Sequence, residues 1–169
     1  MEEYFDIYTI NREPTGKKGV RGQDLKKNEY HIVVMAIIMN KYGEVLITKR
    51  SNNKIAGGKW ECTSGSALAG ESSKEAVIRE IKEELGVTVT IEEEKPISYF
   101  VLDDAIWDIW VVKANIDIKD VKLQHEEVDE AKYVNLEEIT NMIKSRIATK
   151  TIEKMVSLHK KGFIKIANK

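Results

Sequence analysis

The spacing of hydrophobic and polar positions along the chain predicts both strands and helices. Residues 31–39 are apolar almost throughout, which predicts a strand buried on both faces. Gly43 supplies a turn, and residues 44–48 return as the hairpin partner of that strand. Residues 4–10 alternate weakly and predict a short strand. Further strands are expected at residues 87–91, 97–102, 106–116 and 131–134.

Residues 73–85 follow the period of an amphipathic helix. Ser72 and Glu75 form a capping box at its start, and Gly86 is a typical C-terminal stop. Four apolar side chains gather on the side that must face a core: Val77, Ile78, Ile81 and Leu85. This helix lies between predicted strands.

The order of these elements predicts the fold class. Two more helices close the chain, the first starting at Asn135 and the second ending at Gly162. Strands on both sides of a helix, with further helices at the end, predict an α/β fold, an α/β/α sandwich with a mixed sheet. Residues 1–169 are long enough for one domain with its own core, and residues 1–30 are expected to form an N-terminal arm packed on it.

Composition excludes several classes of partner. Lys and Arg total 27 against 28 Asp and Glu, so nothing points to nucleic acid or an anionic membrane. The longest apolar run, residues 32–39, is far shorter than the roughly 20 residues that cross a bilayer. The acidic start lacks the features of a signal peptide, and the single cysteine, Cys62, excludes an internal disulfide. We expect a cytoplasmic protein with a small-molecule substrate.

Three carboxylates crowd one turn of the predicted helix. Glu80, Glu83 and Glu84 are spaced i, i+3 and i, i+4, and they lie near the helix C-terminus, where the macrodipole also disfavours negative charge. Arg79 reaches Glu83 at i+4 but cannot neutralise three acids. A bound divalent cation can, and oxygen ligands without thiolate or imidazole suit Mg²⁺ or Mn²⁺. The alternative is a solvated acidic helix face.

Nine positions of residues 65–87 follow one spacing pattern: Gly65, Glu71, Arg79, Glu80, Ile81, Glu83, Glu84, Gly86 and Val87. This stretch resembles the complete Nudix box. The resemblance implies a Nudix fold and a metal-dependent enzyme that splits a diphosphate linked to another group. It also implies that the Gly65 carbonyl is a metal ligand beside the box acids, and that Glu71 braces the loop and helix. Ser66 departs from the second glycine that many members have, which leaves the loop geometry open.

The reaction implied is attack by water on one phosphorus of a nucleoside diphosphate derivative, a nucleotide or a sugar nucleotide. Glu80 is one candidate for the general base. Glu127 is another, because relatives often supply a late carboxylate, although it equally reads as an exposed acid in the run 126–130. Homodimers are common in the family, and the sequence leaves that state open.

Two other functions stay in consideration. Residues 29–51 and 58–65 resemble the branch that contains isopentenyl-diphosphate isomerases and their hydrolase relatives. Those isomerases use a cysteine seven residues before the box glutamate, where this chain has Ser64, with Cys62 two residues earlier. His31 matches one isomerase metal ligand, but Asp24 occupies the place of another. We therefore favour hydrolysis. A domain that binds nucleotides without catalysis is the remaining alternative.

Four aromatic side chains cluster in the predicted hairpin of residues 97–116: Tyr99, Phe100, Trp107 and Trp110. Trp107 and Trp110 point to opposite faces of a regular strand, so one of them is expected in the core. We predict that an aromatic of this segment holds the organic part of the substrate. Packing roles for both tryptophans are the alternative, and they would move recognition to the loop of residues 49–59.

Overall fold

A mixed sheet forms the centre of the computed structural model, which describes residues 2–168. Its strands are β3 (His31–Met39), β4 (Val45–Arg50), β5 (Trp60–Glu61), β6 (Ser64–Ser66), β7 (Ser98–Leu102), β8 (Ala105–Lys113) and β9 (Val128–Val134). The strand order is β5-β4-β3-β8-β7, with β6 paired to β3 and β9 paired to β4. Strands β3 and β8 are parallel, from His31 opposite Ala105 to Met39 opposite Lys113, and the other pairs are antiparallel.

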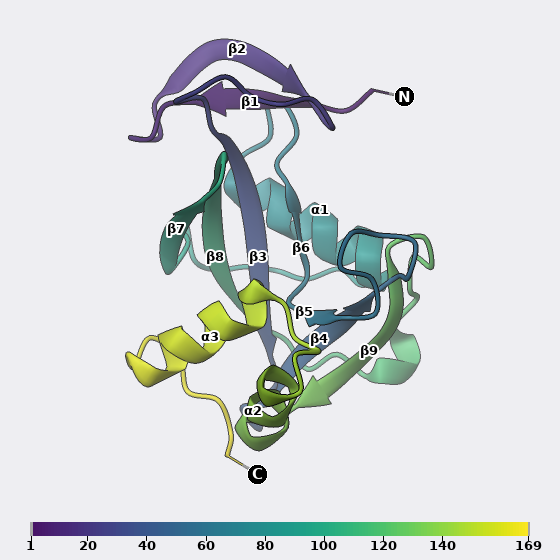
Figure 1. Cartoon of the computed structure of the whole chain (residues 1–169). Helices are drawn as coiled ribbons and strands as arrows, with labels where there is room; N and C mark the ends of the chain where they lie inside the picture. Colours follow the sequence, from purple (N-terminus) through teal and green to yellow (C-terminus); the bar gives the residue numbers. More distant parts are fainter. Residues whose placement is uncertain (1, 169) are drawn as a thin grey trace.

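Helices cover both faces of this sheet, which confirms the predicted α/β class (Figure 1). Helix α1 (Ser73–Leu85) lies on one face, and α2 (Leu136–Lys144) and α3 (Lys150–Lys160) lie on the other. The two hydrophobic cores meet at β3, whose side chains alternate between them. Val34 faces α1, whereas Met35 faces α2 and α3. No helix within residues 2–168 has the length and apolar character needed to cross a membrane.

Helix α1 has the bounds that its capping residues predict. The Ser72 hydroxyl accepts from the backbone N–H of Glu75, and the Glu75 carboxylate accepts from the Ser72 N–H in return. Gly86 ends the helix in the left-handed conformation, with φ of 68°. The box residues therefore lie on a helix whose start and end are both fixed locally.

The predicted strand at residues 87–91 is wrong. Val89 and Ile91 are buried in alternation, as the pattern indicated, but the segment joins no sheet. The strand expected at 106–116 ends at Lys113, and the last strand begins at Val128 rather than at residue 131. A hydrophobic pattern reports which side chains are buried and does not report which backbone groups pair.

The N-terminal residues form a separate two-stranded sheet of β1 (Tyr4–Tyr8) and β2 (Pro14–Val20), at the top of Figure 1. The Tyr8 and Tyr30 backbones exchange hydrogen bonds of 2.7 and 2.9 Å, which join this hairpin to the start of β3. Arg12, in the turn of the hairpin, donates two hydrogen bonds to Asp108 of β8. We propose on these contacts that residues 2–168 fold as one unit.

Arg12→Ala is expected to lower the free energy of unfolding by about 3 kcal/mol, because it leaves the Asp108 carboxylate buried without its cation. Asp108 is fully buried, whereas Arg12 is 30% exposed, so we expect the lower end of the usual range. Denaturant unfolding measures the effect. The matched control is Lys17→Ala, which removes the exposed pair with Glu29 and should cost under about 1 kcal/mol. Equal, small effects in both variants would contradict the anchoring role of Arg12.

Candidate active site

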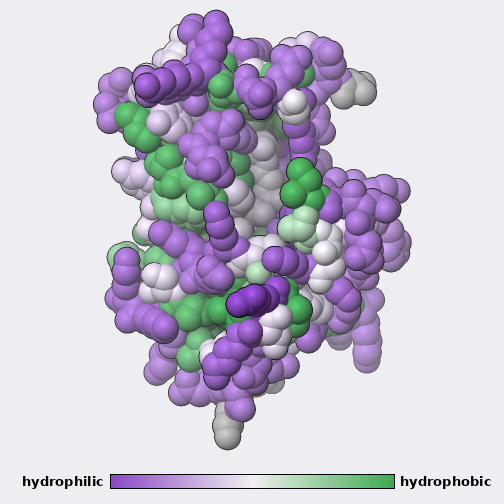
Figure 2. Space-filling view, viewed as in Figure 1, coloured by the Kyte–Doolittle hydropathy of each residue, from purple (hydrophilic) through white to green (hydrophobic). Residues whose placement is uncertain are grey.

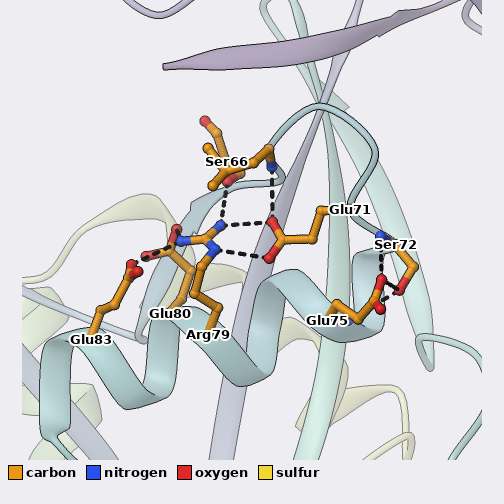
Figure 3. Close-up of polar contacts among 8 residues, drawn as sticks. Ser66, Glu71, Ser72, Glu75, Arg79, Glu80 and Glu83 are labelled. Carbon is orange, nitrogen blue, oxygen red and sulfur yellow. Dashed lines mark hydrogen bonds and ion pairs between the residues drawn. The ribbon is translucent and has the colours of Figure 1, made fainter. Parts of the chain in front are cut away.

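Arg79 is the centre of a charged cluster on the exposed side of α1 (Figure 3). Its guanidinium donates to Glu71 at 2.8 and 2.9 Å, to Glu80 at 2.8 Å, to Glu83 at 2.9 Å and to the Ser66 carbonyl at 2.9 Å. The predicted contact of Arg79 with Glu83 is confirmed. The same arginine also holds Glu80, which the sequence did not predict.

Glu71 joins the loop before α1 to the helix, as predicted. One of its carboxylate oxygens accepts from the Leu68 backbone N–H at 2.9 Å, and both accept from Arg79 (Figure 3). A single acid thus fixes the loop that follows β6. This contact also fixes the orientation of the Arg79 side chain.

Gly65 lies directly against the Glu80 carboxylate. It belongs to β6 and pairs with Val34 of β3, which places its backbone opposite the box helix. A Cβ atom at this position would overlap the Glu80 carboxyl group. A larger residue here would displace the Glu80 carboxylate from its present position, and the Gly65 backbone lies beside that box acid.

Glu84 points away from the Arg79 cluster and into the protein. Its side chain is only 5% exposed, and its Oε2 atom has no hydrogen-bond partner. Burial raises the pKa of Glu84 well above its ordinary value, and the neighbouring carboxylates of Glu61 and Glu80 raise it further. The three acids on one helix turn are thus divided between the partly buried cluster around Arg79, which holds Glu80 and Glu83, and the buried position of Glu84.

Glu61 is a residue of this site that the sequence reasoning missed. It lies on β5 between Trp60 and Cys62, whose side chains are buried in the opposite core, and it is itself only 5% exposed. Nη1 of Arg50 donates to both Glu61 carboxylate oxygens at 2.7 Å. Burial raises the pKa of Glu61, and Arg50 opposes that rise. An acid between tryptophan and cysteine, two residue types that are commonly buried, was the available signal.

The oxygen donors of this region fit a hard divalent cation. Glu84 presents a buried oxygen without a partner, the Glu61 and Glu80 carboxylates lie near it, and the Gly65 backbone is adjacent. Such donors suit Mg²⁺ or Mn²⁺. In this structure no three histidine, cysteine, aspartate or glutamate side chains within residues 2–168 already form a metal-binding group.

Glu127, the second candidate for the general base, lies at the start of β9. Its carboxylate forms an ion pair with Lys54, and its backbone carbonyl accepts from the Ser51 N–H at 2.9 Å. Lys54 lines the cavity beside Gly65, whereas Glu127 does not. The Glu127 carboxylate therefore contacts Lys54, a residue of the cavity wall, but does not itself line the cavity.

Two adjoining cavities open beside these groups. The first, of about 620 Å³, is lined by polar and charged residues that include Arg21, His31, Lys54 and Gly65. The second, of about 500 Å³, is lined mainly by apolar surface. Four residues border both cavities: Arg50, Ile55, Leu102 and Trp107. Figure 2 shows this face, with hydrophobic surface among hydrophilic side chains below the N-terminal hairpin. Charged side chains border both cavities, and the second cavity presents the larger share of apolar surface. The two are called the charged half and the apolar half of the cleft.

The two tryptophans of β8 have different environments, and the prediction that one is core is confirmed. Trp110 is 1% exposed in the core under α1, and its indole N–H donates to the Ser73 hydroxyl at 2.9 Å. Trp107 borders both cavities and stacks on Phe100, with ring centroids 5.6 Å apart and planes 14° from parallel. Trp107 is therefore the tryptophan that a bound molecule can reach.

Cys62 is buried on the opposite side of the sheet from the charged groups. Its Sγ atom lies 3.8 Å from Sδ of Met155 in α3, and burial raises the pKa of the thiol. His31 lines the charged cavity, where burial lowers its pKa and its Nδ1 atom lacks a partner. The thiol that an isomerase mechanism would require has no access to the cleft.

Cys62→Ser is therefore expected to retain near-normal kcat and KM. It should cost about 1–3 kcal/mol of stability, because a hydroxyl replaces a thiol in an apolar core. Steady-state kinetics below the melting transition, together with thermal unfolding, separate the two effects. A loss of kcat in protein shown to be folded would contradict the structural role. Isomerisation of isopentenyl diphosphate that disappears in this variant would favour the isomerase instead.

Comparison with known proteins identifies the family. A family model described as the NUDIX domain matches residues 29–155. The chain belongs to the Nudix family. An uncharacterized Nudix hydrolase of Listeria monocytogenes is 36% identical over 141 residues, covering 82% of this chain and 83% of that protein. This chain is accordingly an enzyme, a Nudix hydrolase.

Solved structures share the Nudix fold. The MutT protein from Methanosarcina mazei Go1 is 30% identical, with a TM-score of 0.61 over 78% of this chain and 96% of that chain. A protein from Deinococcus radiodurans superposes with a TM-score of 0.72 over 87% of this chain and 92% of that chain, at 19% identity. The second likeness concerns the fold alone.

Proposed function

We propose that this Nudix hydrolase uses a divalent cation, Mg²⁺ or Mn²⁺, to cleave the diphosphate linkage of a nucleoside diphosphate derivative. The observation that carries the proposal is the buried, unpartnered oxygen of Glu84, which lies near the Glu80 carboxylate. Glu80 lies against Gly65, in the wall of a cavity that is lined by Arg50 and Lys54 as well as by two aspartates, Asp103 and Asp104. Two shorter matches agree with a nucleotide substrate. They are the CTP pyrophosphohydrolase of Escherichia coli, 36% identical over 37% of this chain, and the ADP-ribose pyrophosphatase of Methanocaldococcus jannaschii, 38% identical over 42%.

The cation would be held by the box acids Glu80, Glu83 and Glu84 and by the Gly65 carbonyl. When bound, it would polarise the phosphoryl oxygens and lower the pKa of a water molecule. Arg79 supports this arrangement because it fixes both Glu80 and Glu83. The residues that would hold the ion thus come from α1 and from the strand packed against it.

Cationic side chains around the charged cavity would bind the diphosphate. Arg50, Lys54 and Gly65 line the same cavity. Both cations would therefore be available to a phosphoryl oxygen bound beside Gly65. The general base is Glu80 or Glu127. Glu127 pairs with Lys54, which lines the cavity, whereas Glu80 lies directly against Gly65.

The apolar half of the cleft would hold the organic part of the substrate. Trp107 and Phe100 supply a stacked pair of rings along its wall, and Ile55, which is 92% exposed, stands at the junction of the two cavities. Bases and sugars both pack on such rings. A substrate that spans both halves would carry its diphosphate beside Arg50.

The alternatives are weaker on specific observations. The buried Cys62 disfavours an isomerase mechanism, and the unpartnered Glu84 oxygen disfavours a domain that has lost catalysis, because a buried acid without a partner costs stability. We keep as proposals a cytoplasmic location, in keeping with one reduced and buried cysteine, and a homodimer.

The test is a panel of nucleoside diphosphates, nucleoside triphosphates and sugar nucleotides assayed with Mg²⁺, with Mn²⁺ and with chelator. We expect one class of compound to release monophosphate or phosphate when Mg²⁺ or Mn²⁺ is present, and none to do so when the metal is chelated. Water labelled with ¹⁸O should appear in one phosphoryl product, because water attacks phosphorus. Metal-independent release, or no release from any compound, would contradict the proposal.

A further inference from the structure

A cluster of buried polar side chains lies on the α1 side of strands β4 and β5. Three of its oxygen atoms lack a hydrogen-bond partner: Oγ1 of Thr48, Oγ1 of Thr63 and Oε2 of Glu84. All three residues are at most 5% exposed. Glu61, equally buried, joins the cluster from β5 and also lines the second cavity. None of the three residues from the sheet side belongs to the Nudix box.

Strand alternation explains why these side chains meet. On β4, Ile47 packs in the core under α2 and α3, so Thr48 points to the α1 side. On β5, Trp60 packs in that same core, so Glu61 also points to the α1 side, and Thr48 and Glu61 are directly paired across the two strands. Glu84, in the last turn of α1, lies near Glu61 and Thr63.

Such a set of groups needs an occupant. An unsatisfied buried polar group costs about 1–3 kcal/mol, and native proteins satisfy most of them with water or ions. The polar cluster presents two carboxylates and two hydroxyls. Within residues 2–168, Arg50 is the one cation in direct contact with an acid of this cluster, and that acid is Glu61. Water satisfies the hydroxyls but does not offset the repulsion between Glu61 and Glu84.

We propose that Glu61 is a ligand of the same divalent cation as Glu84, and that the Thr48 and Thr63 hydroxyls contribute directly or through bound water. The inference rests on the proposed metal-dependent function and adds to it a carboxylate from the sheet. A carboxylate has acceptor capacity beyond the two contacts with Arg50, so Glu61 can bind both groups. Hard oxygen donors of this kind match the preference of Mg²⁺ and Mn²⁺.

Titration of Mn²⁺ in the absence of substrate, followed by the electron paramagnetic resonance of free Mn²⁺, tests the role of Glu61. Glu61→Gln should weaken Mn²⁺ binding at least about tenfold, because it removes a charged ligand while its amide oxygen can still accept from Arg50. The matched control is Glu130→Gln on the neighbouring strand β9, where the acid is exposed and pairs only with Lys49. That control should bind Mn²⁺ as the wild type does.

Unchanged Mn²⁺ affinity in Glu61→Gln, with KM raised, would overturn the inference and leave Glu61 as the residue that holds Arg50.

A second pair of variants guards against misfolding. Thr63→Val should weaken Mn²⁺ binding, whereas Thr63→Ser, which keeps the hydroxyl, should not. Equal affinity in both Thr63 variants would show that the Thr63 hydroxyl contributes neither directly nor through water, and would count against its part in the site. Absence of Mn²⁺ binding by the wild type would instead refute the proposed function.

Discussion

Glu84→Gln is expected to lower kcat by at least about two orders of magnitude with little loss of stability. The substitution removes a charged metal ligand and, with it, the stabilisation of charge at the reacting phosphoryl group. Burial raises the pKa of Glu84 well above its ordinary value, because the charged carboxylate is unfavourable inside the protein. Replacing it with a neutral amide should therefore leave the free energy of unfolding nearly unchanged. Steady-state kinetics with saturating Mg²⁺ and denaturant unfolding measure the two quantities.

Glu83→Gln should lower kcat to a similar extent for a related reason. Glu83 is about half exposed and pairs with Arg79, so its loss costs under about 1 kcal/mol of stability and partly relieves repulsion with Glu80. Glu130→Gln serves again as the control acid. Near-normal turnover in either box variant would remove the metal assignment from these side chains.

Trp107→Ala and Trp110→Ala are expected to separate substrate binding from folding. Trp110 fills the core under α1, so its truncation should cost about 3–5 kcal/mol of stability. Trp107 lines the cleft, so its truncation should remove roughly 1–3 kcal/mol of substrate binding, about 5- to 150-fold in KM, with kcat little changed.

The measurement is KM on the best substrate of the panel, in variants whose folding is verified by circular dichroism. An unchanged KM in Trp107→Ala would leave that ring as a packing residue. Recognition of the organic part would then move to the loop predicted at residues 49–59, whose Ile55 stands at the junction of the two cavities. Its first two residues belong to β4 in the structure.

Local chemistry predicted some elements of the fold to the residue. Helix α1 runs from Ser73 to Leu85 because Ser72 and Gly86 fix its ends through short-range hydrogen bonds, which a sequence displays directly. Strand β2 was not predicted. Residues 14–20 are largely exposed and contain few apolar side chains, so their pairing with β1 leaves little trace in a hydrophobic pattern. The error at residues 87–91 is the converse, because Val89 and Ile91 are buried in alternation while the backbone of the segment pairs with no strand.

The site was predictable where it lies on one helix and not where distant segments meet. Spacing indicated the contact between Arg79 and Glu83, since both residues lie on α1. It could not show that Glu84 faces inward while Glu80 and Glu83 share one guanidinium, because that division depends on the sheet packed against α1. Glu61 joins the site through pairing of β5 with β4, a long-range contact that the sequence leaves unstated.

Calorimetric titration of Mg²⁺ and Mn²⁺ into the enzyme, with and without a slowly hydrolysed diphosphate nucleotide, tests the central claim most directly. We predict binding of either ion in the millimolar range or tighter, strengthened by the nucleotide and abolished or strongly weakened in Glu84→Gln. The absence of any metal binding by the wild-type protein under both conditions would contradict metal-dependent catalysis at this site.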